Sequence, residues 1–243
     1  MTADRCPPER ATIAGYPAVL VRIACGGDPI ALYTVENLEH LVDRDALLRG
    51  EQEPPYWAHL WTGARALARY VIRWNDLRGR RVLEIGCGLG LCGLAAARQG
   101  ANVLCVDNAA PAVAFVRASA GANGVRCRTR CADFRMLAPD LEADTILAAE
   151  VAYERDGFDA LAEIFVRHLA PGGVGLLADG YRTDTRALYA ALGARALTVQ
   201  AIDLLEREDG RTEPLRITAI TQAGSGRLSF ARSMTLLDPR RLG

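Results

Sequence analysis

Three glycines stand where a β-rich run passes into a helical pattern. Gly86, Gly88 and Gly90 follow the run Arg81–Ile85 and precede the apolar stretch Leu91–Gln99. Glycine at such a turn lets the main chain approach a ligand closely, and the first turn of a helix offers N–H groups that have no partner within the helix. We predict that this loop holds a cofactor.

The same loop fits a second interpretation. The segment Gly88–Gly93 matches the dinucleotide-binding pattern GxGxxG, and Asp107 lies at about the right distance along the chain for an acid that binds a ribose. A nicotinamide-dependent oxidoreductase is therefore an alternative at this point.

Two acids favour a different cofactor. Glu84 stands two residues before the first glycine, where a carboxylate can accept a hydrogen bond from the amino group of a methionine moiety but would repel a pyrophosphate. Asp133 ends the third strand of the predicted sheet, where an acid can accept from the exocyclic amine of adenine. The sheet also begins only at Arg81, whereas a dinucleotide-binding domain more often begins near the N-terminus. Together these features favour S-adenosylmethionine, with Asp107 on its ribose.

The sequence resembles the class I, seven-β-strand methyltransferases. More narrowly, it is similar to the protein-lysine methyltransferase branch that includes the enzymes for the β-subunit of electron-transfer flavoprotein. The resemblance covers about residues 35 to 223. It rests on Pro55–Gly63, Leu83–Gly90, Asp107, Asp133-Phe134, Ala149–Tyr153 and Leu169–Gly173.

The resemblance implies roles for individual residues. Trp61, Phe134 and Ala149 would contact the cofactor, with the Phe134 ring stacked on adenine, and Glu150 and Tyr153 would lie at the substrate lysine. The chain departs from the family pattern at two positions. Thr62 replaces the usual proline after Trp61, and Phe134 replaces the usual tryptophan after the acid.

Each candidate also has a plain structural interpretation. Asp107 could cap the helix that follows it, Glu84 could be a surface acid, and Glu150 could cap the next helix. Trp57 and Trp61 could be core aromatics, or they could form an apolar mouth together with Tyr56. We expect His59 to be structural or exposed rather than a catalytic base.

The composition excludes several classes of protein. The 243 residues include 29 basic and 29 acidic side chains, and this balance argues against a broad nucleic-acid surface. All 29 basic residues are arginine, so an enzyme that methylates lysine could not methylate lysine in itself. No apolar run approaches the length of a membrane span, and we see no signal peptide, so we expect a cytoplasmic protein without a membrane partner.

The seven cysteines show no CxxC pair and no metal-ligand spacing to the three histidines. We therefore expect no metal site, and we interpret the cysteines as reduced, buried thiols. The sequence leaves the oligomeric state open.

The pattern after Arg81 alternates strands and helices and then ends in two β-rich runs. This order predicts an α/β fold: a Rossmann-like, seven-stranded, mostly parallel sheet with helices on both faces and a C-terminal antiparallel hairpin, preceded by an N-terminal hairpin and helices. Arginines alternate along Val125–Cys131, a pattern typical of an edge strand. We expect one domain over residues 1–243, divided into an extension (1–60), a core (61–223) and a tail (224–243).

The predicted elements before Arg81 are a hairpin over Ala18–Val35, an acidic helix that ends at Gly50 and a helix over Ala64–Trp74. The predicted strands of the core are Arg81–Ile85, Asn102–Val106, Val125–Cys131, Thr145–Ala149, Val174–Ala178, Leu197–Leu205 and Leu215–Thr221.

The function that these observations predict is methyl transfer from S-adenosylmethionine to a protein lysine. The alternatives are N- or O-methylation of a small molecule, the nicotinamide-dependent oxidoreductase, and a methyltransferase-like fold that only binds a partner. The acids between residues 36 and 53 would attract a basic target.

Overall fold

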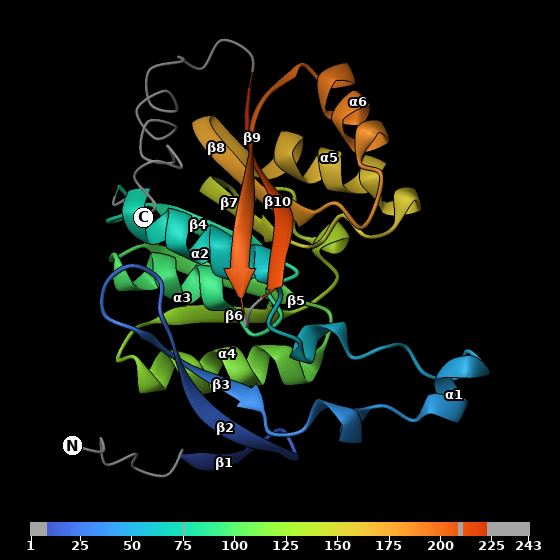
Figure 1. Ribbon diagram of the computed structural model, residues 1–243. Helices are drawn as coiled ribbons and strands as arrows, with labels where there is room; N and C mark the ends of the chain where they lie inside the picture. The colour runs from blue at the N-terminus through green and yellow to red at the C-terminus, as the bar shows by residue number, and fades with distance from the viewer. Residues whose placement is uncertain (1–8, 75, 209–210, 223–243) are drawn as a thin grey trace.

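The computed structural model describes residues 9–74, 76–208 and 211–222. Within these residues the chain forms a three-stranded antiparallel sheet and a seven-stranded sheet with helices on both faces (Figure 1). The predicted tail, residues 224–243, lies outside the described residues. None of the described helices is both long and apolar enough to cross a membrane.

The large sheet has the strand order β6-β5-β4-β7-β8-β10-β9. Strands β6, β5, β4, β7 and β8 pair in parallel, and β10 is antiparallel to both β8 and β9. The predicted seven-stranded sheet with a C-terminal hairpin is therefore confirmed, and β6 lies at its edge as the arginine pattern indicated. The strands are β4 (Arg81–Ile85), β5 (Asn102–Asp107), β6 (Cys127–Cys131), β7 (Ala143–Ala149), β8 (Leu169–Gly180), β9 (Leu197–Glu208) and β10 (Arg211–Gln222).

Two apolar layers hold the helices against the sheet. One core cluster lies beneath α2, α3 and α4, and the other lies beneath α5 and α6. Central strands divide their side chains between the two layers: Val82 belongs to the first cluster and Leu83 to the second. The helices are α2 (Thr62–Trp74), α3 (Leu91–Arg98), α4 (Ala110–Ala122), α5 (Phe158–His168) and α6 (Arg186–Ala194).

The small sheet packs on α4 (Figure 1). It consists of β1 (Arg10–Ile13), β2 (Tyr16–Ile23) and β3 (Ile30–Val35), in that order. The outer edge of β3 is bonded to side chains of the helix rather than to another strand. Asn123, at the end of α4, bonds both the N–H (3.0 Å) and the carbonyl oxygen (2.6 Å) of Ala31, and the Tyr33 N–H donates to Ser119 Oγ (3.0 Å).

Three elements differ from the sequence prediction. The N-terminal hairpin has an additional strand, β1, which pairs with β2 through the turn at Ala14-Gly15. The helix expected before Gly50 is two short pieces, a 3₁₀ turn (Leu38–Leu41) and α1 (Arg44–Leu48). Neither piece packs as a long helix would, because the 3₁₀ turn buries no residue and Leu48 is 86% exposed.

Strand β8 begins earlier than expected. The predicted turn Pro171-Gly172-Gly173 lies inside it as an irregularity, because the register with β7 jumps from Ala143↔Leu169 to Thr145↔Val174. The tightly packed Gly173 allows this path, since a Cβ there would lie 2.9 Å from two carbonyl oxygens.

Candidate active site

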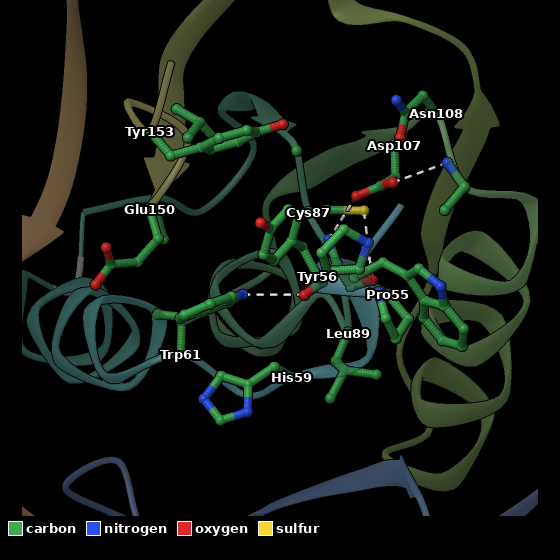
Figure 2. Close-up of a pocket in the computed structure, with 18 of the residues that line it drawn as sticks. Pro55, Tyr56, His59, Trp61, Cys87, Leu89, Asp107, Asn108, Glu150 and Tyr153 are labelled. Atoms are coloured by element: carbon green, nitrogen blue, oxygen red, sulfur yellow. Dashed lines mark hydrogen bonds between the residues drawn. The ribbon is translucent and has the colours of Figure 1, made fainter. Parts of the chain in front are cut away.

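A cavity of about 560 Å³ opens at the carboxyl ends of the parallel strands. This is the edge at which α/β sheets bind ligands, and the volume suits a ligand the size of a nucleoside. Figure 2 shows Asp107 and Asn108 on one side of the cavity and Glu150, Tyr153 and Trp61 on the other. The candidates that line it are Trp61, Glu84, Gly86, Gly88, Gly90, Asp107, Asp133, Phe134, Ala149, Glu150 and Tyr153.

The glycine loop is shaped by contacts that exclude any side chain. Gly86, Gly88 and Gly90 all have positive φ, between 50° and 77°. A Cβ at Gly88 would lie 3.1 Å from the carbonyl oxygen of Trp57, and one at Gly90 would lie 2.6 Å from the Val116 side chain. At its three glycines the loop therefore presents main chain to the cavity, next to Cys87 and Leu89, which also line it (Figure 2).

Asp107 ends β5 and supports the glycine loop from beneath. Its carboxylate is 7% exposed and accepts hydrogen bonds from the N–H groups of Gly88 (2.8 Å) and Ala109 (2.9 Å). Burial raises the pKa of Asp107 above its usual value, while these hydrogen bonds oppose that shift. Asp107 therefore does not cap α4, whose N-cap Ala109 has no side-chain cap bond; its carboxylate stabilises the turn before that helix and lines the cavity.

Glu84 lies deeper than its neighbours. It is 3% exposed, and its Oε2 accepts from the Gly93 N–H (2.9 Å) and from the Cys105 thiol (3.2 Å). Burial raises the pKa of Glu84 to about 7, against the opposing effect of the hydrogen bond from Cys105. A surface acid is therefore ruled out as an interpretation, and the carboxylate is one that a bound cation would help to ionise.

Asp133 and Phe134 form the far end of the cavity, next to the 3₁₀ turn Phe134–Met136. Arg135 donates to both carboxylate oxygens of Asp133, and this ion pair lowers the pKa of Asp133. Asp133 thus stays ionised, as an acceptor for an amine must. The Phe134 ring is partly buried against the apolar layer under α5.

The aromatic mouth contains different residues from those expected. The Tyr56 ring lies 5.7 Å from that of Tyr153 and 6.2 Å from that of Trp61, measured between centroids, and the Trp61 indole N–H donates to the Tyr56 carbonyl oxygen (3.0 Å). Trp57 packs instead against Phe115 on α4, at 5.5 Å. Trp57 thus packs partly on the core while it also lines the cavity, and the aromatic cluster at Trp61 consists of Tyr56, Trp61 and Tyr153.

Glu150 follows β7 and holds three elements together. Its side chain is 6% exposed and accepts from the N–H of Gly63 (3.2 Å), the N–H of Gly180 (3.3 Å) and Arg182 Nη2 (2.6 Å). Glu150 therefore bonds the first turn of α2, whereas the structural alternative expected it to cap the helix that follows it in the chain. Glu150 has a φ of 57°, a strained conformation for a residue other than glycine that is enriched at functional sites.

Sequence reasoning missed Arg182. This residue follows β8, its guanidinium lies 4.3 Å from the centroid of the Trp61 ring, and it is paired with Glu150. It stands in no motif, so only the position of the turn after β8 could have pointed to it. His59 contacts the edge of Trp61, at 4.5 Å between centroids.

The described cysteines are all free. The expectation of buried thiols applies to five of them. It holds at Cys87, Cys92 and Cys105 and in part at Cys127, but it is wrong at Cys131, which is exposed because it ends the edge strand β6. Among the described residues, no group of three or more histidine, cysteine or acidic side chains is arranged to hold a metal ion.

Comparison with known proteins supports one of the two interpretations of the loop. Residues 82–173 match a family described as "Methyltransferase domain". The chain is 32% identical over 143 residues to protein N-lysine methyltransferase METTL21A from Danio rerio, which covers 54% of this chain and 65% of that protein. It is 40% identical over 62 residues to the electron transfer flavoprotein beta subunit lysine methyltransferase of the same organism, covering 25% of this chain and 24% of that protein.

Other similar proteins act on other acceptors. A ubiquinone biosynthesis O-methyltransferase from Sinorhizobium medicae is 34% identical over 121 residues, which cover 49% of either protein. Among solved structures, the 16S rRNA N2 G1207 methyltransferase of T. thermophilus has a TM-score of 0.60 at 18% identity, covering 84% of this chain and 50% of that one. The chain spans less than two thirds of the length of each of these curated relatives.

Proposed function

We propose that this chain is a class I methyltransferase of the protein-lysine branch, which transfers a methyl group from S-adenosylmethionine to the side-chain amine of a protein lysine. The observation that carries the proposal is one continuous cavity. The glycine loop with its two carboxylates lies at one end, and the Glu150 corner with its aromatic mouth lies at the other.

The residues present fit S-adenosylmethionine. The left-handed glycines leave main chain at the cavity wall, where a Cβ at Gly88 would strike the Trp57 carbonyl oxygen. Asp107 would hold the ribose hydroxyls and Glu84 the amino group. Asp133 and Phe134 would hold adenine by hydrogen bonding and stacking, and Trp61 and Ala149 would contact the methionine portion. When bound, the sulfonium supplies an activated methyl group.

The chain must present a neutral amine to that methyl group. A free lysine amine has a pKa of about 10.4, so deprotonation at pH 7 costs roughly 4–5 kcal/mol. The apolar mouth of Tyr56, Trp61 and Tyr153 lowers this cost by desolvating the ammonium. Glu150 and Tyr153 orient the amine so that its lone pair faces the methyl group. With the methyl donor held in this way, the amine would take the methyl group from the sulfonium, S-adenosylhomocysteine would be the leaving group, and the amine would release one proton to solvent overall.

The burial of Tyr153 supports its part in this arrangement. Partial burial raises the pKa of the Tyr153 hydroxyl further above neutral, with Glu154 adding to the shift, and the hydroxyl is protonated at neutral pH. A protonated hydroxyl can donate to a carboxylate or accept from an amine, which is what an orienting group requires.

The test is methyl transfer from radiolabelled S-adenosylmethionine into lysate proteins of the source organism. We expect label in a protein band and, after hydrolysis, in methylated lysine. Because the chain contains no lysine, label in the enzyme itself would not account for that product. Glu150→Gln should lose most of this transfer, while Asp159→Asn, a similar change of charge at an exposed position on α5, should retain it.

A small-molecule acceptor is the second candidate, and the volume of the cavity favours it because a compact acceptor would fit beside the cofactor. Label that appears only in the small-molecule fraction would establish this alternative. Tight binding of NADH without binding of S-adenosylhomocysteine would instead establish the oxidoreductase. We also propose that the protein acts in the cytoplasm, which the free cysteines support.

A further inference from the structure

A cation of the chain itself contacts two of the residues that line the cavity. Arg182 Nη2 lies 2.6 Å from Glu150 Oε2, and the guanidinium carbon lies 4.3 Å from the centroid of the Trp61 ring. Glu150 and Trp61 lie on the same side of the cavity (Figure 2). A carboxylate and an indole face are the two groups that bind an organic cation most effectively, and here both contact the same guanidinium.

Among the hydrogen-bond donors to the Glu150 carboxylate in the described residues, Arg182 is the one that carries a charge. The carboxylate is 6% exposed, and its other donors, the N–H groups of Gly63 and Gly180, are neutral. If Arg182 leaves and nothing replaces it, a nearly buried carboxylate loses its counter-charge, which is strongly unfavourable. A cation that enters as Arg182 leaves restores the pair.

Arg182 is nevertheless free to move. Its side chain is 53% exposed, and it lies in the turn between β8 and α6 rather than in either element. An exposed arginine of this kind reaches solvent by rotation about its side-chain bonds, without a change in the backbone. The contact with Trp61 and Glu150 is therefore a replaceable one.

We propose that Arg182 is the specificity-determining residue of the acceptor site: its guanidinium holds the place between Glu150 and Trp61 until an acceptor that carries its own positive charge displaces it. This inference rests on the proposed function and deepens it. Neutral and anionic acceptors are rejected because they would leave Glu150 unpaired, whereas an alkylammonium replaces one ion pair with another. Specificity here comes from the penalty on the wrong ligand.

The rival role for Arg182 is an anion clamp. A guanidinium at the mouth of a cavity also suits the carboxylate of a small acceptor. The two roles make opposite predictions for removal of the Arg182 charge. If the acceptor displaces Arg182, removal of the charge strengthens the binding of an ammonium ligand. If Arg182 clamps an anion, removal of the charge weakens the binding of a carboxylate ligand.

The experiment is calorimetric titration of the S-adenosylhomocysteine-loaded protein with three probes of similar size: n-butylammonium, n-butanol and butyrate. Arg182→Gln keeps a hydrogen-bond donor for Glu150 but removes the charge. We expect it to bind n-butylammonium about tenfold more tightly than the unmodified chain does, with no gain for butyrate. Arg155→Gln, which removes an exposed arginine paired with Asp184, is the matched control and should bind as the unmodified chain does.

Two results would overturn the proposal. One is an Arg182→Gln protein that binds n-butylammonium no more tightly than the control. The other is butyrate binding to the unmodified chain that is lost in the variant, which would establish the clamp. Binding of S-adenosylhomocysteine is measured first on each protein. Its absence in the unmodified chain would count against the proposed function, whereas its presence with no gain in n-butylammonium affinity counts against the role of Arg182 alone.

Discussion

The two ends of the cavity are built in different ways. At the cofactor end, Asp107 and Glu84 are buried and bond main-chain N–H groups of the adjoining loop and helix. At the acceptor end, Glu150 connects three distant segments, and the aromatic side chains of Tyr56 and Tyr153 are half exposed. The cofactor end is built from the ends of neighbouring strands in the sheet, and the acceptor end is assembled from distant parts of the chain.

This contrast separates the part of the site that tolerates little substitution from the part whose ligand preference can vary. A site made by main chain and two acids tolerates little change, because each replacement alters the backbone that contacts the ligand. A site made by exposed side chains can change its preference one residue at a time. The cofactor end should therefore respond to substitution with large losses of cofactor affinity, and the acceptor end should respond with almost none.

The largest loss of cofactor affinity is expected for Asp107→Ala. The change removes the proposed ribose ligand and leaves the Gly88 and Ala109 N–H groups without their acceptor. We expect S-adenosylhomocysteine to bind roughly 100-fold more weakly, about 2.7 kcal/mol, as measured by calorimetry. An affinity within threefold of the unmodified chain would show that Asp107 stabilises the turn and is not a ligand.

Gly88→Ala should have the next largest effect. A left-handed residue with a Cβ costs roughly 1–2 kcal/mol, and here the Cβ would also lie 3.1 Å from a carbonyl oxygen of the cavity wall. We expect a loss of at least about tenfold in affinity for S-adenosylhomocysteine. Gly79→Ala is the matched control, because Gly79 has a φ of 73° and open space around it. It should lower the melting temperature but leave the affinity unchanged.

The pH dependence of binding tests Glu84. Its pKa of about 7 means that the carboxyl is mostly protonated below pH 7 in the ligand-free protein, whereas a bound amino group requires the ionised form. Affinity should therefore fall as the pH decreases through 7, by about tenfold between pH 8 and pH 6, with release of a proton on binding. Calorimetry in two buffers of different ionisation enthalpy measures that proton. Glu84→Gln should abolish both the slope and the proton release.

Glu150→Gln should have the smallest effect on cofactor affinity, less than about twofold, because no described hydrogen bond of Glu150 reaches the glycine loop. The amide still accepts from a neighbouring N–H but loses its charge partner. We expect the unfolding free energy to fall by about 1–3 kcal/mol in thermal denaturation, since the pair is nearly buried. A large loss of cofactor affinity here would abolish the distinction between the two ends.

The same distinction explains what the sequence could predict. Gly86, Gly88 and Gly90 lie within five residues of one another, and Asp107 ends the next strand, so spacing alone placed them at the same edge of the sheet. Seven strands and the C-terminal hairpin followed from periodicity and turns. These are short-range signals, and the chain folds them locally.

The acceptor end could not be assembled in this way. Glu150 bonds Gly63, 87 positions away, and Arg182, 32 positions away. Arg182 stands in no motif, and the motif that ends at Gly63 does not indicate which acid its N–H group meets. The side on which the Trp57 ring packs was equally hidden, because adjacent aromatic residues face different ways only once α4 is in place. Likewise, the apolar residues before Gly50 recur at helical spacing, and this periodicity predicted a helix. The segment around the exposed Leu48 has no surface to pack on, so tertiary contacts do not support a long helix there.

The hydrogen bonds between β3 and the end of α4 have a consequence for association between copies of the chain. An open strand edge offers a row of donors and acceptors onto which a second polypeptide can add, and this is a common start of aggregation. Asn123 and Ser119 occupy those groups at Ala31 and Tyr33, so a helix closes the edge that a neighbouring molecule would otherwise extend. The side chains of Asn123 and Ser119 thereby keep the β3 edge of the three-stranded sheet from pairing with a strand of another molecule.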